Sequence, residues 1–134
     1  MENNFAIVSE DTPLLVDLDT NENISLILEY HYKYSIDNAT EYTNELLKKC
    51  GYLHLAQKRP FELNKKDKLI IRYLRAYVSP KEKIAIIKPF SMLNHVDDLS
   101  YLEELVDILN EKKMQIVDTT MHKYYKENRC PIKK

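Results

Sequence analysis

Few side chains in this sequence have the types and spacing that metal chemistry needs. The four histidines are His31, His54, His95 and His122. No two of them are four residues apart, the spacing at which two ligands share one face of a helix. His95, Asp97 and Asp98 together could bind a divalent ion, but acidic side chains at the start of a helix also stabilise the helix dipole. We therefore expect neither a metal nor another cofactor.

The two cysteines and the single glycine argue against a nucleophilic thiol and against a phosphate-binding loop. Cys50 and Cys130 lie far apart and form no CxxC motif, which predicts two free thiols in a reducing compartment. The sequence offers neither thiol an obvious general base, so a nucleophilic cysteine has no support. Gly51 is the only glycine, whereas phosphate-binding loops such as GxxxxGK and GxGxxG need several. On these residues alone, the chain is not a complete nucleotide-binding enzyme.

Composition indicates one globular domain. The chain has 134 residues, of which 44% are hydrophobic and 31% charged, and it lacks an apolar run long enough to cross a membrane. A net charge of -1 argues against nucleic acid as a partner, and the absence of a signal peptide predicts a cytoplasmic protein. One basic stretch could be a solvated face or a contact to phosphate or to an acidic partner. It consists of Lys65, Lys66, Lys68, Arg72 and Arg75.

Three segments in the first two-thirds of the chain predict helices. The first begins near Asn23, with a cap at position 19 or 20 and apolar side chains at 24, 27 and 28, and places His31 on the same face. The second ends at Gly51, a residue suited to the left-handed end of a helix, and we place its capping box at Asn38 and Glu41. Asn64 caps the third helix, which Ser79 and Pro80 end.

Three short apolar runs predict buried strands, at residues 5–8, 84–87 and 115–117. Between the last two lies a helix with leucines at 99, 102 and 109 on one face, for which we expect a cap at Asn94 or Asp97. Strand, helix and strand at this spacing imply parallel pairing with a right-handed crossover. The predicted class is therefore α/β, a small parallel three-stranded sheet with flanking helices, followed by a short helix in the polar tail.

The order of these segments resembles an ABC-transporter ATP-binding domain from its Q-loop to its switch region, over residues 5–124. Residues 14–24 are similar to the stretch that follows the Q-loop, and Pro-Phe-Ser-Met-Leu-Asn at 89–94 is similar to the family's PFSALD. The resemblance implies one domain over residues 1–134. Residues 20–80 would form the helical subdomain, and residues 4–10 with 81–125 a partial core of the P-loop NTPase type.

The sequence departs from the family at the positions that carry catalysis. The Q-loop glutamine, the LSGGQ signature, the Walker B acids and the switch histidine are matched by Glu10, residues 63–67, Ile87 with Lys88, and Thr120. His122 is close enough to Thr120 to leave that last register open. The sequence also begins after the place where the P-loop would lie. The resemblance therefore implies that ATP is not hydrolysed and that the protein is not an enzyme.

The resemblance also implies where partners bind. The family receives the coupling helix of a membrane permease at the Q-loop and the helical subdomain, and the matching residues here are Glu10, Leu14, Leu15, Asp17, Asn23, Ile27 and Tyr30. The edge at residues 115–118 would lack its neighbouring strand. We expect the tail, a second copy of the chain or a partner strand to cover Gln115 and Val117 there.

The leading interpretation is a non-catalytic accessory or regulatory subunit of a bacterial ABC transporter. It would bind the permease, the active ATPase or both, in the cytoplasm and at most peripherally at the inner membrane. Two alternatives belong to other classes of protein. One is a stand-alone dimeric interaction module. The other is a small ligand-binding or metal-binding protein with a new activity that uses His95, Asp97, Asp98 or Cys50.

Overall fold

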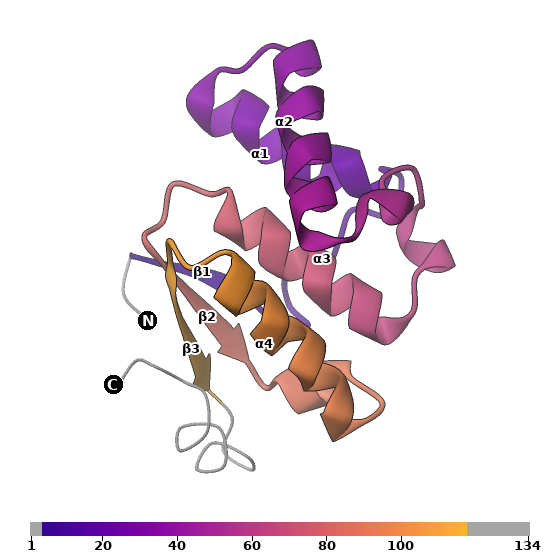
Figure 1. Cartoon of the computed structure of the whole chain (residues 1–134), viewed down its shortest axis with the longest axis vertical. Helices are drawn as coiled ribbons and strands as arrows, with labels where there is room; N and C mark the ends of the chain where they lie inside the picture. Colours follow the sequence, from indigo (N-terminus) through magenta and orange to yellow (C-terminus); the bar gives the residue numbers. More distant parts are fainter. Residues whose placement is uncertain (1–3, 118–134) are drawn as a thin grey trace.

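The computed structural model describes residues 4–117, and Figure 1 shows a sheet with covering helices below a pair of further helices. The helices and strands, in chain order, are β1 (Phe5–Val8), α1 (Thr20–Tyr32), α2 (Ile36–Cys50), α3 (Lys65–Tyr77), β2 (Lys83–Ile87), α4 (Leu99–Ile108) and β3 (Lys113–Val117). Short 3-10 turns lie between them at Leu53–Leu55, Pro60–Glu62, Pro89–Met92 and Val96–Asp98.

The three strands form one parallel sheet in the order β1-β2-β3. Central β2 pairs Ile86 with Val8 on one side and with Ile116 on the other. Its residues 84–86 are fully buried, which explains a continuous apolar run in place of an alternating one. The predicted α/β class and three-stranded parallel sheet are confirmed.

Helix α3 connects the two parts of the molecule. It contacts β1, β2 and α4 below, and α1 above (Figure 1). The burial of Tyr73 and Leu74, both 0% exposed, reflects contacts on several sides of this helix. Fixing α3 therefore fixes how the α1–α2 pair sits on the sheet.

Capping interactions determine where α1 and α2 begin and where α2 ends. Asp19 caps α1 in a reciprocal box with Glu22, at 2.8 and 3.0 Å. The expected cap of α2 at Asn38 is wrong, because the Ser35 hydroxyl accepts the Asn38 N–H at 3.1 Å and the helix starts at Ile36. Gly51 ends α2 with φ of 87°, as predicted. His31 is exposed, because α1 ends one residue later and the chain turns away.

The second half of the chain also differs from expectation at one helix start. Asn64 caps α3 as predicted, accepting the Asp67 N–H at 2.7 Å. Neither Asn94 nor Asp97 caps α4, because residues 96–98 first form a 3-10 turn and α4 begins at Leu99. The predicted helix of the tail lies outside the described residues, as do Thr120, His122 and Cys130.

Candidate functional site

Asn23, one of the predicted partner-binding residues, is a buried amide in the first turn of α1. Asn23 is 2% exposed and its side chain accepts the Leu15 N–H at 2.8 Å. Its amide nitrogen lies 3.1, 3.2 and 3.0 Å from the carbonyl oxygens of Leu15, Leu18 and Asp19. Asn23 therefore positions the segment 14–19 against the first turns of α1 and is not itself available to a partner.

The outer side of this arrangement is apolar and exposed. Leu26 and Tyr30 are 43% and 72% exposed, and the spacing of 23, 26, 27 and 30 places them on one side of α1. Leu15 and Val16, which Asn23 holds next to this side, are 50% and 68% exposed. The α1 surface is defined here as Leu15, Val16, Leu26, Ile27 and Tyr30. Exposed apolar side chains gathered in this way are characteristic of contact sites.

The other predicted residues of this region divide into supporting and exposed positions. Leu14 is 6% exposed and belongs to the core, so it supports the segment from inside. Glu10 and Asp17 are exposed. Glu10 does not belong to the α1 surface, because it lines a separate basic pocket with residues of α3.

Arg75, a member of the basic stretch, is a positioning residue, a role that the sequence does not predict. Its guanidinium donates to the carbonyl oxygens of Pro13 and Thr12, at 3.0 and 2.5 Å, and so fastens the segment after β1 to α3. Burial lowers the pKa of Arg75, and the nearby charge of Arg72 lowers it further. The segment that leads to the α1 surface is thus held at both ends, by Arg75 and by Asn23.

The basic pocket is a small cavity of about 150 Å³ between α3, the end of β1 and the turn after β2. Its lining residues are Glu10, Lys65, Lys68, Arg72, Ser91 and Met92. The spacing of 65, 68 and 72 places the three cations on one face of α3, which the sequence alone indicates. That Glu10 and Ser91 complete the pocket depends on the tertiary fold.

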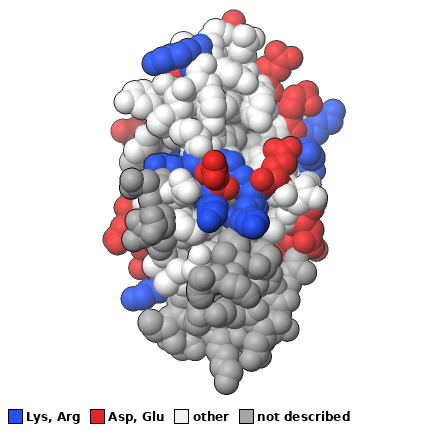
Figure 2. Space-filling view, turned by 90° about the vertical axis from the view of Figure 1, so that its left-hand side faces the viewer, with Lys and Arg blue, Asp and Glu red and all other residues white. Residues whose placement is uncertain are grey.

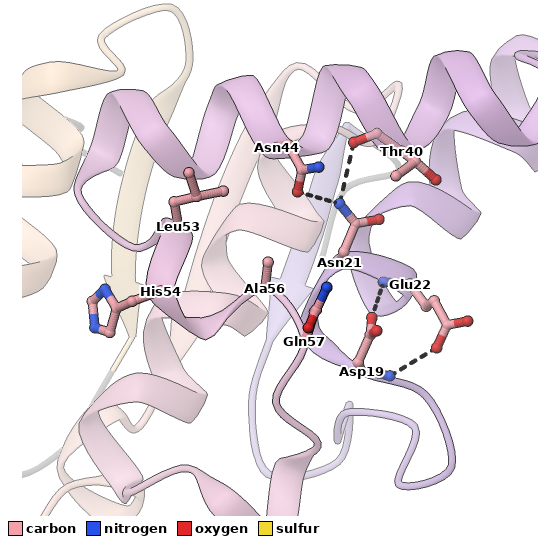
Figure 3. A pocket seen from close by; sticks show the side chains of 9 residues that line it. All are labelled: Asp19, Asn21, Glu22, Thr40, Asn44, Leu53, His54, Ala56 and Gln57. Atoms are coloured by element: carbon pink, nitrogen blue, oxygen red, sulfur yellow. Dashed lines mark hydrogen bonds between the residues drawn. The ribbon is translucent and has the colours of Figure 1, made fainter.

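A larger cavity of about 470 Å³ lies between α1, α2 and the 3-10 turn that follows (Figure 3). Figure 3 shows Asn21 pointing toward Asn44, to which its amide donates at 2.8 Å, while His54 lies at the opposite end from Glu22. Asp19 and Glu22 are engaged in the α1 cap. The acids and the histidine do not converge, so the cavity is a polar groove without an acid–base pair.

The residues proposed for metal or thiol chemistry are dispersed. His95 is exposed just before the 3-10 turn that precedes α4, and Asp97 is exposed within that turn. Cys50 is 8% exposed, and burial raises the pKa of its thiol to about 11, which leaves it unreactive at neutral pH. Within residues 4–117, no three His, Cys, Asp or Glu side chains are grouped so that they could hold a metal ion.

At the opposite edge of the sheet, β3 pairs with β2 alone among the described strands. Met114 and Ile116 are buried, whereas Gln115 and Val117 alternate with them and are half-buried. No described strand lies beyond β3, so this edge of the sheet stays a candidate for pairing with a further strand.

Charges on the side of the molecule that faces left in Figure 1 are mixed in sign. Figure 2 shows lysine and arginine side chains at mid-height, with acidic side chains beside them and an uncharged region above. Two polar contacts join the loops at the amino ends of β2 and β3: Lys112 donates to the Ser79 carbonyl at 2.6 Å, and the Tyr77 hydroxyl donates to Glu111 at 3.1 Å.

No helix in the described part of the chain is both long and apolar enough to span a bilayer. Neither a protein-family model nor a curated protein matches the sequence. Among solved structures, the chain is similar to the dimeric ATP-binding cassette MJ0796 bound to ADP and Pi in a post-hydrolysis state. The TM-score is 0.65 and the identity 22%, over 86% of this chain and 51% of that one, so this chain spans about half of its length. The likeness shows that the fold is that of an ABC ATPase.

Proposed function

We propose that the protein is a non-catalytic accessory or regulatory subunit of an ABC transporter. It binds the permease or the active ATPase subunit through the α1 surface. The observation that carries the proposal is the exposed apolar set Leu15, Val16, Leu26 and Tyr30. The contacts of Asn23 with Leu15 and of Arg75 with Pro13 hold the segment before α1 in place beside the helix. In the family that this chain resembles, the same part of the fold receives the coupling helix of the permease.

The residues at the end of β2 support the absence of catalysis. Ile87 and Lys88 stand where the resemblance places the Walker B acids, and neither can bind Mg²⁺ or activate water. Lys88 is in the left-handed conformation, with φ of 52°, and its N–H donates to the Val117 carbonyl at 2.7 Å. An aliphatic side chain and a cation at this position favour a structural role for the turn.

The start of α3 supports the same conclusion. Positions 63–67 correspond to the signature, whose serine and glycines contact phosphate in the family. Here Asn64 is occupied as the helix cap, and Lys66 forms an ion pair with Asp67 at 3.3 Å and lies over the Tyr101 ring at 4.2 Å. These side chains interact with one another, which favours a scaffold over a nucleotide site.

Co-purification tests the proposed partner. The tagged full chain is isolated from detergent-solubilised cells, and the captured proteins are identified and quantified by mass spectrometry. We expect an ABC permease or ABC ATPase subunit, and a loss of at least tenfold with Leu26→Asp, because a buried charge opposes docking of an apolar surface. Ile108→Asp is the matched control, because Ile108 is 42% exposed on α4 and Leu26 is 43% exposed on α1. Recovery of only unrelated soluble proteins would contradict the proposal.

A self-dimer is a second candidate, favoured by the edge of β3. Pairing of Lys113–Val117 with the same strand of a second copy would continue the sheet beyond β3, its last described strand. Light scattering measures the molar mass in solution. A mass of two copies, with slow hydrogen exchange at residues 113–117, is expected for this dimer, whereas a mass near 15.9 kDa contradicts it.

A further inference from the structure

The basic pocket is lined by more cationic than anionic side chains. Lys65, Lys68 and Arg72 point to it from one face of α3, and Glu10 is the one carboxylate in its lining. No ion pair joins any of these four side chains to another residue within 4–117. Three cations against one anion give a local excess of two positive charges, although the whole chain carries a net charge of -1.

Arg72 has few strong hydrogen-bond acceptors among the described residues. Its Nε atom is buried and has no hydrogen-bond partner among them, and its Nη1 donates to the Met92 sulfur at 3.1 Å, a weak acceptor. Burial lowers the pKa of Arg72, while the charge of Glu10 raises it. A half-buried guanidinium with so few strong acceptors is stabilised by an anion that enters the pocket.

We propose that the basic pocket binds a phosphate group, either as inorganic phosphate or as the terminal phosphate of a small molecule. A volume of about 150 Å³ is below the range of roughly 300 to 1,000 Å³ typical of sites that enclose a whole ligand. It suits a single tetrahedral oxyanion. Three cations on one helix face can each contact a different phosphate oxygen, whereas the carboxylate of a partner side chain offers two oxygens. This inference does not depend on the proposed docking of α1.

The experiment is calorimetric titration of the full chain with inorganic phosphate at constant ionic strength, and in parallel with AMP as a phosphomonoester. Lys68→Gln and Arg72→Gln each remove one cation, and we expect about tenfold weaker binding or more, the loss typical of one charge-assisted hydrogen bond. Lys68→Gln keeps the test valid if Arg72→Gln does not fold. Lys48→Gln on α2 is the matched control, because Lys48 is exposed and lies outside the pocket.

The Glu10→Gln variant tests whether more positive charge in the pocket strengthens phosphate binding. Removing the one carboxylate of the lining makes the pocket more positive, so phosphate should bind more tightly, by severalfold. Tighter binding of AMP identifies the phosphate as the end of a larger molecule, and equal binding identifies free phosphate. The proposal is overturned if neither ligand binds saturably at millimolar concentration. It is also overturned if Lys48→Gln weakens binding as much as Lys68→Gln does, or if Glu10→Gln weakens it.

Discussion

Replacement of Asn23 tests whether one buried amide organises the segment before α1. In Asn23→Ala, the Leu15 N–H loses its acceptor at 2.8 Å, and the carbonyls of Leu15, Leu18 and Asp19 lose a shared donor at 3.0–3.2 Å. Asn23→Asp keeps the acceptor but replaces the donor with a charged oxygen that faces these carbonyls. The two variants therefore separate loss of the donor from repulsion.

The size of the effect follows from the number of groups left without partners. A lost hydrogen bond costs about 1 kcal/mol, and a buried polar group left unsatisfied costs about 1–3 kcal/mol. Asn23→Ala should thus lower the free energy of unfolding by about 2–4 kcal/mol. For a chain of this size that corresponds to a fall in Tm of roughly 10 °C. Asn23→Asp should cost about 2 kcal/mol more at neutral pH, because its carboxylate is buried beside three carbonyl oxygens.

Urea denaturation followed by circular dichroism measures these differences. A protonated aspartate can donate to the carbonyls, so the deficit of Asn23→Asp should shrink as the pH falls toward 4. Asn38→Ala is the control, because Asn38 is an exposed asparagine within α2, and we expect a change within about 0.5 kcal/mol. Equal stability of the alanine and aspartate variants at pH 7 would show that a carboxylate at position 23 is not repelled by the three carbonyl oxygens.

Three further predictions concern stability. Arg75→Lys should lower the free energy of unfolding by about 1–2 kcal/mol and speed hydrogen exchange at residues 9–12, since one ammonium cannot hold both carbonyls that the guanidinium does. Unchanged exchange there would show that the contact is dispensable. Gly51→Ala should lower the free energy of unfolding, measured in urea, by about 1–2 kcal/mol. The loss comes entirely from the backbone φ of 87°, because an added Cβ meets no atom within 4 Å. Burial raises the pKa of Cys50 to about 11 and, with the Glu111 hydrogen bond, that of Tyr77 to about 12. The folded state favours their neutral forms, so stability should be constant from pH 7 to 9 and fall as the pH rises toward 12; a urea midpoint that does not fall contradicts this.

Features set by local interactions could be predicted from the sequence. Asp19, Asn64 and Gly51 act within one turn of their own helix, so residue type and spacing suffice to place them. The start of α2 was missed because Ser35 and Asn38 both suit a cap, and only the path of the chain after α1 decides between them. The start of α4 was missed because a 3-10 turn precedes it.

The sites depend on contacts between distant segments, and the sequence alone showed them only in part. Of the α1 surface, Leu15, Ile27 and Tyr30 could be recognised from the sequence, whereas Val16 and Leu26 could not. The burial of Asn23 beside them was not foreseen either. The carbonyls that Arg75 holds at Thr12 and Pro13 lie more than 60 residues before it. Similarly, the spacing of the cations on α3 is visible in the sequence, whereas Glu10 reaches the same pocket only once β1 and α3 pack together.

Photo-crosslinking tests directly whether the α1 surface binds a subunit of an ABC transporter. A photoreactive phenylalanine derivative replaces Tyr30, which is 72% exposed, and in a parallel variant it replaces Ile108, which is 42% exposed on α4. Both variants are crosslinked in living cells. Crosslinked products are identified by mass spectrometry. We expect Tyr30, and not Ile108, to crosslink to an ABC permease or ABC ATPase subunit. Crosslinks from Tyr30 only to a second copy of this chain, or only to proteins unrelated to ABC transporters, would contradict it.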